Sequence, residues 1–172
     1  KKSSWHIEDI KETEAKRNPN APFTTSSIQQ TASNRLGFSP SRTMSVAQKL
    51  YEKGLITYMR TDSTSISKDA TAEIVTTIEK NYGKDKVELR TYKTKSKNAQ
   101  EAHEAIRPTH PAHMSGGSTD DEKKLYQLIW QRTIASQMIS ATILRTKIIA
   151  RSSDERVPTF AVNGSILKLE GW

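Results

Sequence analysis

The spacing of apolar residues changes twice along this chain of 172 residues, and the change limits the folds that it can adopt. Near the start, Trp5, Ile7 and Ile10 stand in a charged, roughly alternating segment that predicts a half-exposed strand. Further along the chain the apolar residues recur at helical spacing, and after Ala141 the pattern becomes strand-like again. This order predicts a mainly helical α+β fold in which a helical domain is inserted into a β domain.

Two short helices joined by a tight turn are predicted in the first part of the helical block. The first takes Thr25 as its N-cap and ends at Gly37, with Ile28, Ala32 and Leu36 at fourfold spacing. A turn over residues 37–42 follows, and the second helix then runs to Gly54 with one face formed by Val46, Ala47, Leu50 and Tyr51. The pair is typical of a helix-turn-helix, and a plain helical hairpin is the alternative.

The rest of the helical block alternates loops with helices. Residues 55–60 are β-prone, and a third helix is predicted from the Ser67 cap to Gly83, with Ile74, Ile78 and Tyr82 facing inward. Residues 84–97 are basic and predict a solvated loop, and residues 101–106 predict one helical turn. Thr119 and Glu122 form a capping box for the most regular helix, whose apolar residues continue to Ile139.

The last part of the chain predicts strands at 142–151, 157–162 and 165–169, with Asn163-Gly164 as a hairpin turn. Residues 16–22, which contain two prolines and two asparagines, predict a linker. The expected domains are therefore a β segment over 1–19, a helical domain over 20–141 and a second β segment over 142–172. Because the chain begins at Lys1 and ends directly after a strand, we expect it to be an internal piece of a longer protein.

Charge and cysteine content narrow the function classes. Lysine and arginine number 27 against 19 aspartates and glutamates, giving a net charge of +8, which favours a polyanionic partner such as nucleic acid. The absence of cysteine excludes disulfides, thiolate catalysis and cysteine-bound zinc. No apolar run is long enough to span a membrane, so we expect no membrane partner and a cytoplasmic protein.

Tyr58 is the strongest candidate nucleophile, because Arg60 follows two residues later. A phenol holds its proton at neutral pH, and a nearby guanidinium can both favour the phenolate and grip a phosphate. Attack on a DNA phosphodiester would form a phosphotyrosine ester and conserve the bond energy, so resealing would need no ATP. The alternative is a core tyrosine whose hydroxyl is satisfied within the protein.

Polar residues on either side of Tyr58 are candidate DNA contacts. A stripe on the first helix is suited to phosphates or base edges, although a solvated face is the alternative. It comprises Thr24, Thr25, Gln29, Gln30, Asn34 and Arg35. Thr61 and Asp62 follow Arg60, and a helical turn would place His103 and Arg107 on one face toward a phosphate. His103, His110 and His113 match no familiar zinc spacing, so no metal is expected there.

Three segments together resemble bacterial type IA DNA topoisomerases: PFTTSSIQQTASNRLGFSPSRTMSVAQKLYE, GLITYMRTDSTSIS and QEAHEAIRPT. The resemblance covers residues 5–172 and implies an enzyme that relaxes negatively supercoiled DNA by transient single-strand cleavage, strand passage and religation. It implies that Tyr58 is the nucleophile that holds the 5′ phosphate, that Arg60 contacts the scissile phosphate and that His103 lies in the DNA-binding site. It also implies a winged-helix-like tyrosine domain inserted between strands of an arch domain.

The resemblance has one departure. The family's N-terminal domain, with its acidic Mg²⁺ cluster, has no counterpart here, because Asp120, Asp121 and Glu122 are better explained as helix capping. We therefore expect Mg²⁺ to be bound by that domain, no metal in this segment, and an inactive isolated chain. The expected partners are single-stranded and negatively supercoiled DNA and the N-terminal metal-binding domain. A helix-turn-helix module without chemistry is the alternative, whereas a tyrosine recombinase would need a set of Arg and His residues that is not arranged here.

Overall fold

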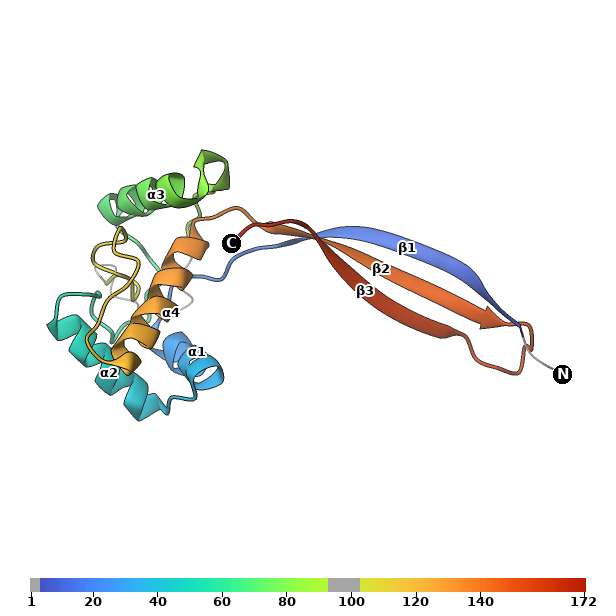
Figure 1. Cartoon of the computed structure of the whole chain (residues 1–172), viewed down its shortest axis with the longest axis horizontal. Coiled ribbons are helices and arrows are strands. Elements are labelled where there is room, and N and C mark those ends of the chain that lie inside the picture. Colours follow the sequence, from blue (N-terminus) through green and yellow to red (C-terminus); the bar gives the residue numbers. More distant parts are fainter. Residues whose placement is uncertain (1–3, 93–102) are drawn as a thin grey trace. The chain divides into compact units, whose positions relative to one another are not determined.

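A computed structural model describes residues 4–92 and 103–172, and the chain divides into two compact units (Figure 1). One unit joins Lys1–Asn18 to Ser140–Trp172, and the other is Pro19–Ile139. The described residues form four α-helices and a three-stranded antiparallel sheet, in the predicted order of strand, helical block and strands. The predicted α+β class is confirmed.

The sheet consists of β1 (Trp5–Arg17), β2 (Ala141–Ser152) and β3 (Phe160–Leu169), with β2 in the middle (Figure 1). Its register puts apolar residues in one cross-strand row, for example Ile10, Ile148 and Val162. The adjacent row, on the opposite face, contains Lys11, Lys147 and Asn163. The large apolar side chains of β1 and β3 are more than half exposed at Ile7, Ile10, Phe160, Val162, Ile166 and Leu167.

Two predictions about the strands were wrong. Asn163-Gly164 is not a turn, because β3 runs through it and Gly164 pairs with Thr146 of β2. The turn lies before β3, where the Asp154 carboxylate accepts bonds from the backbone and guanidinium of Arg156. β1 also continues to Arg17, into the predicted linker, because Ala141 of β2 lies opposite that residue.

The first two helices are present with shifted ends. α1 (Thr25–Leu36) is capped by the hydroxyl of Thr24 rather than that of Thr25, and it ends at Gly37, whose φ of 67° is left-handed. α2 (Pro40–Glu52) begins inside the predicted turn, because Ser39 serves as the cap and Pro40 suits the first helical position. The turn between the two helices is therefore shorter than the sequence pattern indicated.

The other two helices complete the helical unit. α3 (Lys68–Tyr82) begins at the predicted Ser67 cap and buries Ile74 and Ile78, but Tyr82 is 43% exposed, contrary to prediction. A short 3-10 helix, η1 (Lys84–Lys86), follows. α4 (Asp120–Ser136) has the predicted Thr119 cap and contacts α1, α2 and α3, so it lies at the centre of this unit.

Two segments expected to be regular are irregular. Residues 55–60 form only an isolated bridge, from Ile56 to Pro108, instead of a strand. Of the predicted helical turn, residues 101–102 lie outside the described part, and residues 103–106 are not helical. The Ile106 N–H donates to the Phe23 carbonyl at 2.8 Å, so a partner distant in sequence replaces the helical bond.

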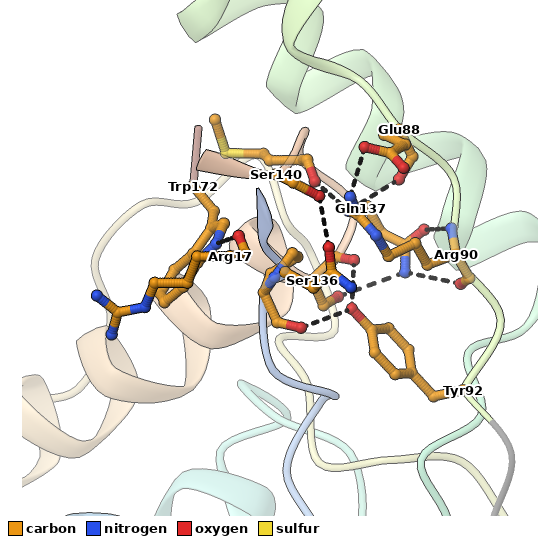
Figure 2. A network of polar contacts seen from close by, with 11 residues as sticks. Arg17, Glu88, Arg90, Tyr92, Ser136, Gln137, Ser140 and Trp172 are labelled. Carbon is orange, nitrogen blue, oxygen red and sulfur yellow. Dashed lines mark hydrogen bonds and ion pairs between the residues drawn. The ribbon is translucent and has the colours of Figure 1, made fainter. Parts of the chain in front are cut away.

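The predicted solvated loop after α3 is in part held by the end of α4 (Figure 2). The Glu88 N–H donates to the Gln137 carbonyl at 2.9 Å, and the Arg90 N–H donates to the Gln137 side chain at 3.0 Å. The Tyr92 hydroxyl donates to the Ser136 carbonyl at 2.9 Å. Residues 84–92 are therefore anchored, whereas residues 93–97 lie outside the described part of the chain.

Among the described helices, none combines the length and the apolar character needed to cross a membrane.

Candidate functional site

Tyr58 lies on an irregular segment of the helical unit between two buried anchors. Ile56 and Met59 are each 1% exposed, whereas Tyr58 is 46% exposed. Its ring meets that of Tyr51 on α2 edge to face, with centroids 5.3 Å apart and an interplanar angle of 65°. The buried neighbours fix the backbone while the phenol faces solvent, which argues against the alternative of a core tyrosine.

Arg60, Thr61, Asp62 and His103 come together at an open pocket of about 380 Å³. The first turns of α1 complete its lining with Thr25, Ser26 and Gln29. Arg60, Asp62 and His103 are exposed, and no acidic residue lies in the first turn of α1. A guanidinium and an imidazole beside a helix N-terminus without acidic residues form a surface suited to a phosphate.

His103 and Arg107 do not share the predicted helical face, because no helix forms over these residues. Arg107 is tied down instead, because its guanidinium donates to the Glu104 carboxylate at 2.6 Å and to the Pro108 carbonyl at 2.9 Å. The Arg107 side chain is only 12% exposed. The predicted helical pairing of the His103 and Arg107 side chains was therefore wrong, because residues 103–107 are not helical.

Glu104 holds this extended segment in place. Its carboxylate accepts the Ser67 N–H at 2.7 Å in addition to the Arg107 guanidinium. Burial acts to raise the pKa of Glu104, but the hydrogen bonds from Arg107 and Ser67 outweigh it and lower that pKa below its ordinary value. Glu104 is therefore a charged structural link between α3 and the segment that carries His103.

The other predicted DNA contacts differ in how available their side chains are. Gln30 and Arg35 are exposed on α1, and Gln29 lies in the pocket. The Thr24 hydroxyl caps α1, and the Thr25 hydroxyl is bonded to the backbone of the Tyr58 segment. Sequence reasoning missed Ser26, and it grouped Tyr51 on one face with Leu50, although Leu50 is buried and Tyr51 is 41% exposed. Ser26 was detectable as a hydroxyl beside Thr25 at the helix start.

The described residues do not fit a Mg²⁺ site. His110 and His113 have ring centroids 5.7 Å apart, but nowhere in the described ranges do three His, Asp or Glu side chains gather as metal ligands would. Asp121 forms an ion pair with Arg42, and Glu122 forms one with Lys53. These carboxylates therefore join α2 and its C-cap to the start of α4, a role that the capping interpretation did not include.

Comparison with known proteins gives a consistent result. A family model described as DNA topoisomerase matches residues 1–172. The chain is 46% identical to DNA topoisomerase 1 of Rickettsia typhi, over all of the chain and 24% of that protein. It is 48% identical to DNA topoisomerase 1 of Streptomyces coelicolor, over 91% of the chain and 17% of that protein. The chain thus spans a quarter or less of the length of these relatives.

A solved structure is similar over almost the whole chain. The full-length topoisomerase I from Thermotoga maritima matches with a TM-score of 0.75 and 38% sequence identity. The match covers 95% of this chain and 28% of that one. The similarity in fold therefore extends over both compact units.

Proposed function

The chain belongs to the bacterial DNA topoisomerase I family, and from this premise we propose that it is the nucleophile-bearing part of a type IA enzyme. The whole enzyme would relax negatively supercoiled DNA by cutting one strand, passing another strand through the gap and resealing it. The observation that carries the proposal is the exposed phenol of Tyr58, two residues from the pocket that contains Arg60 and His103. Single-stranded DNA is the proposed ligand of that pocket.

In the proposed reaction, the Tyr58 phenol gives up its proton as its oxygen attacks a backbone phosphorus. The bond from phosphorus to the 3′ oxygen breaks, the 5′ phosphate stays on Tyr58, and the departing 3′ oxygen takes up a proton. Arg60 would hold the phosphate and stabilise the charge that develops on its oxygens. Attack of the 3′ hydroxyl on the phosphotyrosine reverses each change, so the strand is resealed without ATP.

We assign the flanking DNA contacts according to side-chain availability. Gln29 and Asp62 line the pocket beside Arg60, which supports a direct role in binding the strand, whereas the buried Thr61 hydroxyl accepts the Ser63 N–H and is assigned a supporting role. Gln30 and Arg35 are exposed further along α1 and would contact the adjacent backbone. Thr24, Thr25 and Arg107 have side chains bonded within the protein, so we assign them a supporting role in the same site.

We propose that the two compact units are the two expected domains. The helical unit, Pro19–Ile139, would be the tyrosine domain, with α1 and α2 as its helix-turn-helix-like pair. The sheet formed by β1, β2 and β3 would be part of the arch. A continuous chain that leaves the sheet, forms the helical unit and returns to the same sheet supports an inserted domain.

Mg²⁺ would be held by the N-terminal domain of the full-length enzyme, since the described residues here offer no suitable ligand set. We propose that this segment alone does not cleave DNA. The chain covers only 24% of the length of the Rickettsia typhi enzyme, which supports this proposal. Cleavage of a labelled oligonucleotide by the segment alone would contradict this proposal.

Covalent capture in the full-length enzyme tests the assignment of the nucleophile. A single-stranded oligonucleotide labelled at its 3′ end is incubated with Mg²⁺ and enzyme, and label on the denatured protein is measured. We expect label on the native enzyme and on Tyr82→Phe, which removes the hydroxyl of another exposed tyrosine. Tyr58→Phe should carry none.

Two other outcomes of the capture experiment would contradict the assignment of Tyr58 as the nucleophile. Label on the Tyr58→Phe enzyme would show that another residue attacks DNA. No label on any of the enzymes, with DNA binding retained, would favour a binding module without chemistry.

A further inference from the structure

The Thr57 hydroxyl, next to Tyr58 in sequence, is bonded to a different segment of the chain. It donates to the Ala105 carbonyl at 2.7 Å and accepts the Arg107 N–H at 3.0 Å. The Thr57 N–H also donates to the Arg107 carbonyl at 2.9 Å. Thr57 thus brackets residue 106 and links the Tyr58 segment to the segment that carries His103.

Thr25 repeats this arrangement on the other side of the nucleophile. Its hydroxyl donates to the Met59 carbonyl at 2.8 Å and accepts the Thr61 N–H at 2.9 Å. The Thr25 N–H donates to the Thr61 carbonyl at 2.9 Å. Thr25 thus brackets Arg60 and links it to the first turn of α1.

The two threonines share one bonding pattern, which we call the threonine clasp. In each clasp the hydroxyl donates to one carbonyl and accepts the N–H two residues later, and the threonine N–H binds the carbonyl of that second residue. The Tyr58 segment takes part in both clasps: Thr57 holds another segment, and Met59–Thr61 is held by Thr25. The clasps therefore join three segments that the chain brings from distant positions.

We propose that Thr25 and Thr57 are paired positioning residues that set Tyr58 and Arg60 in register with His103 for strand cleavage. This inference rests on the function proposed above. Residues 55–63 form no regular strand, so few backbone bonds fix Tyr58 and Arg60 directly. Each hydroxyl supplies a donor and an acceptor that a β ladder would otherwise provide. A small displacement of the attacking phenol slows cleavage steeply. The affinity for the rest of the DNA strand depends little on that displacement.

The test compares valine and serine at both positions in the full-length enzyme. Thr25→Val and Thr57→Val keep the side-chain shape and remove the hydroxyl, whereas Thr25→Ser and Thr57→Ser keep the hydroxyl. Thr76→Val is the control, because that exposed threonine on α3 bonds only within its own helix, to the Ala72 carbonyl at 3.0 Å. The single-turnover cleavage rate, the Kd for a single-stranded oligonucleotide and the melting temperature are measured for each.

We expect each valine variant at the clasps to cleave about 10- to 100-fold more slowly. Its Kd should change by less than about threefold, because no clasp hydroxyl is free to bind DNA. The serine variants should recover most of the rate, and Thr76→Val should match the native enzyme. This pattern separates positioning from a general loss of stability.

Two outcomes would overturn the proposal. One is a native cleavage rate in both valine variants. The other is loss of cleavage in proportion to lost binding or folding, with no recovery by serine, which would mean that the hydroxyls are only structural. Failure of the proposed function is distinguishable, because it appears as covalent label on Tyr58→Phe whatever the threonine variants do.

Discussion

Tyr51 near the end of α2 supports the ring of Tyr58, the two ring centroids being 5.3 Å apart in an edge-to-face arrangement. Both tyrosines are exposed, at 41% and 46%, so the ring contact is a restraint on the orientation of the Tyr58 phenol. An edge-to-face aromatic pair contributes about 0.5 to 1.5 kcal/mol beyond area burial. The pair thus connects the reactive side chain to a regular helix.

Replacing Tyr51 should therefore weaken cleavage without removing the nucleophile. We expect Tyr51→Ala to slow single-turnover cleavage about 2- to 10-fold, the range that corresponds to the energy of one aromatic pair. Tyr51→Phe keeps the ring and serves as the control, with a rate near that of the native enzyme. Equal losses in the two variants would show that the Tyr51 hydroxyl matters rather than the ring contact.

Glu104→Gln should destabilise the helical unit in a pH-dependent way. The pKa of Glu104 is lowered in the folded chain, so its stabilisation is present above the ordinary pKa of 4.5 and is lost as pH falls through the folded value. We expect the free energy of unfolding to fall by about 1 kcal/mol at pH 7. This is less than the value for a buried charged hydrogen bond, because Glu104 is partly exposed to solvent. The difference from the native chain should vanish at low pH in chemical denaturation.

Glu79→Gln, on the exposed face of α3, is the control for that measurement. It should change the unfolding free energy little at any pH, because a single exposed charge contributes little. A difference between Glu104→Gln and the native chain that stays constant down to pH 2 would contradict the charged link.

Lys53→Met should cost more stability than Arg42→Met, although both remove an ion pair between α2 and the start of α4. The partner of Lys53 is Glu122, whose side chain is 3% exposed and also accepts the Ser118 N–H at 2.8 Å. The partner of Arg42 is Asp121, which is 31% exposed and can regain water. Loss of an exposed pair costs at most about 1 kcal/mol. Thermal unfolding of the two variants tests the order, and a reversed order would contradict it.

Tyr92→Phe should destabilise the anchored segment after η1 (Figure 2). Burial raises the pKa of Tyr92, so its hydroxyl stays protonated and donates to the Ser136 carbonyl. Removing that donor should cost about 0.5 to 1.5 kcal/mol, the usual net value of one such bond. Chemical denaturation measures it, with Tyr82→Phe as an exposed control that should be near neutral. Equal effects at both positions would show that the bond to Ser136 contributes nothing.

The sequence by itself determined the starts of α3 and α4 and the order of the elements. Ser67 and Thr119 were predictable as caps because each hydroxyl accepts a backbone N–H three residues later, so the signal and the structure lie within one turn. Gly37 was predictable as a helix end for the same local reason, since its positive φ favours glycine. The Tyr58–Arg60 pair was also visible, because its two members are close in the chain.

Tertiary structure decided what depends on partners far away in sequence. Asn163-Gly164 became part of β3 because β2 offered a continuous ladder, and residues 103–107 became extended because Thr57 and Phe23 supplied their backbone partners. The same long-range bonds brought His103 beside Arg60 and turned the Thr25 hydroxyl inward. Local conformational propensity contributes tenths of a kcal/mol to about 1 kcal/mol per residue to the folding free energy. Leaving a buried backbone N–H or carbonyl without a hydrogen-bond partner costs more, so partners distant in sequence decide the local structure.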